Sequence, residues 1–158
     1  MQARASGAMD ERAALPAAEG VLLWSMRAWV LARCRSEDLQ VEQRIEAALG
    51  GLDAAEAGCG LCGFMGAVER GGTRTVTVER MCARQLTEDE RALLGVFACV
   101  QAGRTADAAR ALRGMVGPSA VGPALERAAD VALALAGAGH ALATGGMPGA
   151  PQPGARLH

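Results

Sequence analysis

The chain has 158 residues and a net charge of −1, and 51% of its residues are apolar while 21% are charged. This length suits one folded domain, and this composition is that of a globular chain rather than a disordered one. The balanced charge and the aromatic content of 3% disfavour nucleic-acid binding, which needs a basic surface and aromatic side chains that stack on bases.

Composition also bears on the origin and location of the chain. All sixteen basic residues are arginine, a bias typical of a GC-rich bacterial genome. The longest apolar stretch, residues 21–32, contains Arg27 and falls short of the roughly 18 apolar residues of a membrane span. The first residues lack the apolar core of a secretory signal. We therefore expect a cytoplasmic protein that does not associate with membranes.

Two helices are predicted in the first third of the chain. Residues 1–16 are small and polar and are interpreted as a flexible lead. A helix over residues 17–35 is apolar around most of its circumference, so we expect it to lie at the centre of the fold. Ser36 has the side chain of an N-cap and predicts the start of a second helix, which ends at the glycine pair 50–51.

A third helix and one extended segment follow. Asp53 and Glu56 have the spacing of a capping box, which predicts a helix from Asp53 to about Arg70. Apolar and polar residues alternate over about 74–79, which is the pattern of a strand. No second strand is predicted to pair with it. We therefore expect either an extended connector that lies on the helices or one half of a ribbon between two molecules.

Three more helices are predicted in the second half. Thr87 and Glu90 form a capping box before a clear apolar run, which predicts the fourth helix. Thr105 is predicted to cap a fifth helix that closes at Gly117. Pro123 suits the first position of a sixth helix, which is rich in alanine and leucine and should be largely buried.

The predicted fold is all-α, a compact bundle of about six helices that forms a single domain over residues 17–143. It carries one short extended segment at about 74–79. Residues 144–158 are rich in glycine and proline and are interpreted as a disordered tail.

The cysteines are the candidates for chemistry. Residues 58–63 read GCGLCG, in which two cysteines stand three residues apart, the spacing of a zinc or iron–sulfur knuckle. Such a site needs three or four ligands, and the sequence has no second CxxC pair, so a site would combine Cys59 and Cys62 with Cys82. The alternative hypothesis is therefore a metal-binding or thiol-redox sensor that uses Cys59, Cys62 and Cys82.

The favoured interpretation of GCGLCG is structural. Gly58, Gly60, Gly63 and Gly66 lie in the helix predicted around the cysteines. Each glycine in a helix costs up to about 1 kcal/mol relative to alanine, so such a run indicates a helix against which neighbours pack very closely. Cysteine acts there as a small apolar residue. A continuous helix through residues 58–63 favours this interpretation, and a break there favours the metal site.

No motif of an enzyme is found. The sequence lacks a phosphate-binding glycine loop, a nucleophile elbow and a metalloprotease motif. We therefore expect no catalysis and no cofactor, and we predict an accessory or regulatory subunit that acts by protein–protein interaction. Its partner is another protein or a second copy of the chain, and the extended segment is the feature that a partner strand would complete.

Overall fold

The structure is a computed structural model and describes residues 9–143. Within this range the chain is all-α, as predicted, and has no β-strand. Its seven helices are α1 (Glu11–Ala14), α2 (Ala17–Arg35), α3 (Asp38–Gly50), α4 (Ala57–Gly71), α5 (Glu88–Gln101), α6 (Thr105–Arg113) and α7 (Pro118–Gly137). The tail predicted over 144–158 and the first part of the predicted lead, residues 1–8, lie outside the described residues.

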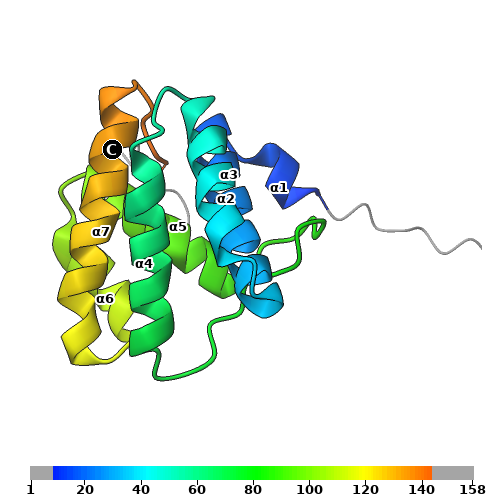
Figure 1. The fold of residues 1–158 in the computed structure, drawn as a ribbon. Helices are drawn as coiled ribbons and strands as arrows, with labels where there is room; N and C mark the ends of the chain where they lie inside the picture. Colours follow the sequence, from blue (N-terminus) through cyan, green and yellow to red (C-terminus); the bar gives the residue numbers. More distant parts are fainter. Residues whose placement is uncertain (1–8, 144–158) are drawn as a thin grey trace, which may run out of the picture.

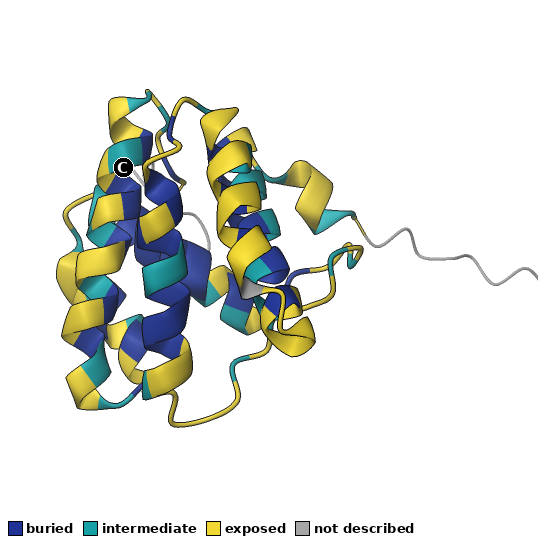
Figure 2. Cartoon of the chain, in the orientation of Figure 1, coloured by how far each residue is buried: buried dark blue, intermediate teal, exposed yellow. Residues whose placement is uncertain are grey.

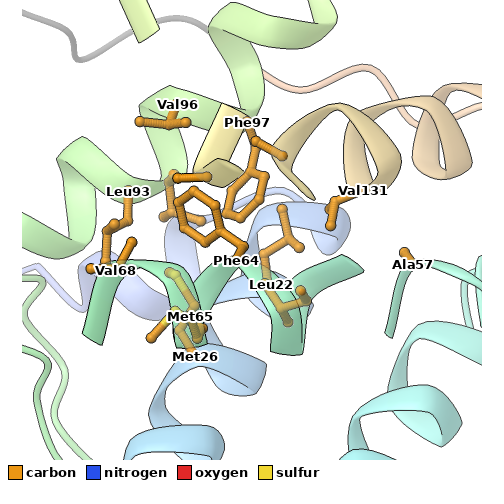
Figure 3. Packing of buried hydrophobic residues seen from close by; sticks show 14 of the residues in the cluster. Leu22, Met26, Ala57, Phe64, Met65, Val68, Leu93, Val96, Phe97 and Val131 are labelled. Carbon is orange, nitrogen blue, oxygen red and sulfur yellow. The ribbon is translucent and has the colours of Figure 1, made fainter. Parts of the chain in front are cut away.

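The helices pack into a compact bundle (Figure 1). Helices α4 and α7 lie side by side and make the most extensive contact, α5 and α6 pack against each other and against α7, and α2 and α3 pack beside α4. Each long helix turns a buried face inward and an exposed face outward (Figure 2). In the core, the rings of Phe64 and Phe97 lie 4.6 Å apart between their centroids, close to Leu22 and Leu93 (Figure 3).

Residues 58–63 are helical throughout, as the packing interpretation of GCGLCG predicts. A Cβ atom on Gly60 would lie 3.1 Å from Cβ of Asp130 and from Cγ2 of Val131, both on α7. At the end of α4, Ala120 of α7 occupies the space that a Cβ atom on Gly71 would need. These glycines weaken the helix itself but allow α4 and α7 to approach closely.

Two helix starts in the first half differ from the prediction. Helix α4 begins at Ala57, because Asp53 has a φ of 59° and completes the turn after α3. The predicted capping box is absent, since the N-cap Glu56 makes no side-chain cap hydrogen bond. Ser36 is the C-cap of α2, with a φ of 56°, and not the N-cap of α3. In both places a short polar residue with a positive φ belongs to the turn after the preceding helix instead of starting the next one.

Two helix starts in the second half also differ from the prediction. Thr105 is the first residue of α6, and Arg104 is its N-cap. Helix α7 begins at Pro118, so that Pro123 lies inside the helix and not at its start. Pro118 fits the first helical position as well as Pro123 does, and it follows Gly117, whose backbone is extended.

The remaining helices divide into two that were predicted well and one that was not predicted. Helix α2 has the predicted bounds, and α5 begins with the predicted capping box, in which Thr87 accepts a hydrogen bond from the main chain of Glu90 and Glu90 accepts one from the main chain of Thr87. Helix α1 is a single turn within the predicted lead, with Asp10 as its N-cap. The segment at about 74–79 forms no strand with another described segment of the chain and connects α4 to α5.

Candidate functional site

The structure places the three candidate cysteines on two different elements. Cys59 and Cys62 lie in the N-terminal half of α4, whereas Cys82 is exposed in the segment between α4 and α5. Within residues 9–143, no group of three or more His, Cys, Asp or Glu side chains is arranged so that it could hold a metal ion. The structure therefore does not bring Cys82 to Cys59 and Cys62 as a set of ligands.

The chemistry of Cys62 is that of a protonated thiol. Burial, followed by the charges of Glu42, Cys59 and Glu46, raises its pKa to about 11. The thiolate is the nucleophile and the metal ligand, so a raised pKa works against both roles at neutral pH. Burial also raises the pKa of Cys99, which lies in the core.

A buried ion pair joins α2 to α5. Arg27 Nε donates to Glu90 Oε1 at 2.8 Å and Arg27 Nη2 donates to Oε2 at 2.9 Å, and the two side chains are 1% and 0% exposed. Burial acts to raise the pKa of Glu90, but the hydrogen bonds from Arg27 and from two main-chain N–H groups outweigh it and lower the pKa. One sign of this pair is visible in the sequence, because Arg27 lies within an otherwise apolar helix and a buried charge needs a partner.

The same ion pair fastens the segment between α4 and α5, which we call the connector (residues 72–87). Figure 1 shows the connector leaving the end of α4 and running along the side of the bundle towards α1. The two side chains of the ion pair bind four of its main-chain groups. These are the carbonyl groups of Ala83 and Gln85, bound by Arg27 at 2.7 and 3.0 Å, and the N–H groups of Glu79 and Thr87, bound by Glu90 at 3.0 Å each.

The first turn of α5 also fixes which way the connector faces. Thr77 N–H donates to Asp89 Oδ2 at 2.7 Å, and the Thr77 carbonyl accepts from Thr87 Oγ1 at 2.7 Å. Two residues further on, Glu79 N–H donates to Glu90 Oε1. The main-chain groups of alternate residues, 77 and 79, therefore point towards α5, as they do on one edge of an extended chain.

On either side of Thr77, at Val76 and Val78, the opposite edge of the connector is unpaired. In an extended chain, the N–H and C=O groups of Val76 and Val78 point away from α5, because those of Thr77 and Glu79 point towards it. No hydrogen bond of the described residues uses the main-chain groups of Val76 or Val78. We call these four groups the free edge. They resemble the exposed edge of a strand, where unpaired N–H and C=O groups are able to pair with another chain.

An apolar groove with a volume of about 400 Å³ lies beside the free edge. It is lined by Trp29, Val30, Arg33 and Cys34 of α2, by Met65, Val68 and Glu69 of α4, and by Gly72, Arg74, Val76 and Val78 of the connector. The charges at its rim are paired within the chain, Arg33 with Glu69 at 3.2 Å and Arg74 with Asp89 at 2.7 Å. The groove therefore offers apolar surface with little unbalanced charge.

Comparison with known proteins finds no matching family model, no matching curated protein and no matching solved structure. Within residues 9–143, none of the helices combines the length and the apolar character that crossing a membrane requires.

The geometry of the free edge and the groove suits binding. The free edge offers two donors and two acceptors in a row, and the groove beside it offers room for apolar side chains. The valines at positions 76 and 78 belong to both features, because their main-chain groups form the free edge and they also line the groove. A ligand that satisfies the edge therefore lies next to the groove.

Proposed function

We propose that the protein acts by binding another protein, as an accessory or regulatory subunit without catalysis of its own. The observation that supports this proposal is the free edge at Val76 and Val78 beside an apolar groove. A partner segment in extended conformation adds to the free edge as a second strand, and its main-chain groups pair with the unpaired N–H and C=O groups.

The groove selects among such partners. Side chains of an added strand alternate between its two faces, so residues two apart enter the groove together. The groove is apolar, and the charges of Arg33 and Arg74 are already balanced within the chain. The preferred partner segment therefore carries aliphatic residues at alternate positions and no charge on the face that enters the groove.

The experiment is a selection of peptides from a random displayed library on the wild-type protein, followed by binding measurements on variants. Val78→Pro removes an N–H group that no hydrogen bond of the chain uses, and proline and the residue before it both accept an extended backbone. We expect the selected peptides to show alternating aliphatic residues. We expect Val78→Pro to weaken their binding at least tenfold without lowering the unfolding midpoint.

Glu88→Pro is the matched control. Residue 88 is exposed, it stands at the first position of α5, and Thr87 before it has an extended backbone, so proline fits without the loss of a hydrogen bond. This variant should bind the selected peptides as the wild type does. Equal binding by Val78→Pro and wild type would show that the free edge is not the binding surface.

A further inference from the structure

The free edge is short, and both of its ends are defined. Beyond Val78, the carbonyl of Arg80 accepts from Ala83 N–H at 3.1 Å and the chain turns away. Before Val76, the chain bends at Thr73 and Arg74, just after an antiparallel bridge between Gly72 and Val116 whose hydrogen bonds use the Gly71 carbonyl and Thr73 N–H. The edge therefore offers two residues that flank Thr77 symmetrically, each with one donor and one acceptor.

We infer that the partner at this edge is a second copy of the same chain, paired antiparallel about Thr77. This inference rests on the proposed function, because it names the partner of the same edge. In this register Val76 of each copy lies opposite Val78 of the other, and each such pair exchanges two hydrogen bonds. The four groups of each free edge are then satisfied, and four hydrogen bonds are formed between the two copies.

The side chains and charges fit this register. Opposite β-branched residues and opposite threonines are favourable cross-strand pairs, and the register provides both, Val76 with Val78 and Thr77 with Thr77. Two copies with a net charge of −1 repel each other little. At the ends of the pairing Arg74 faces Arg80 of the second copy, but Asp89 balances the charge of Arg74 at 2.7 Å.

A second copy also loses less conformational entropy on binding than a flexible peptide does. Two residues of edge supply few hydrogen bonds, and a flexible peptide must lose its conformational freedom in order to form them. The second copy presents the same segment already held in place by Asp89 and Glu90. Preorganisation therefore favours self-pairing at so short an edge.

The small size of the edge sets the expected strength of the dimer. Stable dimers bury roughly 600–1,000 Å² on each copy, which is more than a segment of about five residues contributes. We therefore expect a dimer that depends on concentration and forms in the micromolar range or above. Sedimentation velocity from 1 µM to 1 mM should show the dimer fraction rise for the wild type and for Glu88→Pro, and stay near zero for Val78→Pro.

A disulfide between two copies tests directly whether Thr77 of one copy lies opposite Thr77 of the other. Thr77 lies on the twofold axis in a non-hydrogen-bonded pair, where Cα atoms are about 4.5 Å apart, a separation that a disulfide spans. The variant Thr77→Cys is made in a background in which the exposed Cys34, Cys59 and Cys82 are replaced by serine. We expect mild oxidation to link two copies through residue 77, as identified by mass spectrometry of the linked peptides.

Thr75→Cys in the same background is the control. It lies on the same face of the connector, but the two cysteines of the dimer would be roughly 13 Å apart, which is too far for a disulfide. Linking by Thr77→Cys and not by Thr75→Cys supports the register. A chain that stays monomeric up to 1 mM and forms no Thr77→Cys disulfide overturns self-pairing, whereas selected peptides that still bind through the free edge would leave the proposed function standing.

Discussion

Helix α4 and the connector that follows it are held in the fold by different means. The helix packs against α7 through positions without side chains, such as Gly60 and Gly71, so that many small contacts share the stabilisation. The connector has no helix or sheet of its own, and polar side chains from α2 and α5 hold its main chain. A single substitution should therefore affect the two regions in different ways.

This difference indicates which substitutions should destabilise the fold most. One ion pair, Arg27 with Glu90, binds four main-chain groups of the connector and also joins two helices. Loss of either partner leaves the charge of the other buried without its counter-charge and removes two of the four hydrogen bonds to the connector. The packing of α4 against α7 does not depend on one pair of residues. It is instead sensitive to substitutions that add atoms at its glycines.

The largest effect is expected for Arg27→Ala. It leaves the fully buried carboxylate of Glu90 without its partner, so the free energy of unfolding should fall by about 3–5 kcal/mol in urea denaturation at pH 7. Arg33→Ala is the control, because the pair of Arg33 with Glu69 is nearly half exposed and such pairs contribute about 0–1 kcal/mol. Similar losses for the two variants would contradict the central role of the buried pair.

Acid should weaken the same ion pair. The pKa of Glu90 in the folded chain lies below the usual value of 4.5, so the pair contributes fully above that value and its contribution is lost as the pH falls through the lower, folded pKa. Unfolding midpoints measured from pH 7 down to pH 3 should fall mainly below about pH 4.5. Glu90→Gln should show a smaller fall over this range, and an equal fall would assign the acid sensitivity to other carboxylates, such as Asp89.

A smaller effect is expected where α4 meets α7. Gly71→Ala places a methyl group against Ala120, and overpacking of this kind costs about 1–3 kcal/mol. The matched control is Gly20→Ala on α2, where no atom lies within 4 Å of the new Cβ and alanine should stabilise the helix by up to about 1 kcal/mol. Two substitutions of the same kind should therefore shift the thermal midpoint in opposite directions. Stabilisation by Gly71→Ala would show that the helices can separate there without cost.

How far the sequence predicted each region follows from the range of the interactions involved. The helices α2 and α5 and the helical path of GCGLCG depend on residues close in the chain, and their prediction was correct. The starts at Ser36 and Asp53 were wrong because a short polar residue suits either end of a helix, and the neighbouring elements decide which one it takes.

The extended character of the connector was predicted, but the edge that is hydrogen-bonded to α5 was not. Alternation of residues 74–79 indicates an extended chain, yet it does not say which edge is paired. Which edge is paired depends on Asp89 and Glu90, whose carboxylates accept hydrogen bonds from the N–H groups of Thr77 and Glu79. The partner of Glu90 is 63 residues away at Arg27, and no local pattern reveals it.

The smallest effect concerns the thiols and leaves stability unchanged. With a pKa of about 11, Cys62 should react with iodoacetamide at pH 8 at least tenfold more slowly than the exposed Cys34, and faster as the pH rises towards 11. Mass spectrometry of the labelled peptides over time measures each rate. Rapid, paired modification of Cys59 and Cys62 would instead favour the sensor that uses these cysteines with Cys82.

The orientation of the connector is the central claim, and amide hydrogen exchange read by NMR at single residues tests it most directly. At a concentration where the chain is monomeric, the amides of Thr77 and Glu79 should exchange slowly and those of Val76 and Val78 quickly, and Val76 and Val78 should become protected once a partner binds. Equal protection of all four amides in the monomer, or protection of Val76 and Val78 alone, would contradict the free edge and the binding role built on it.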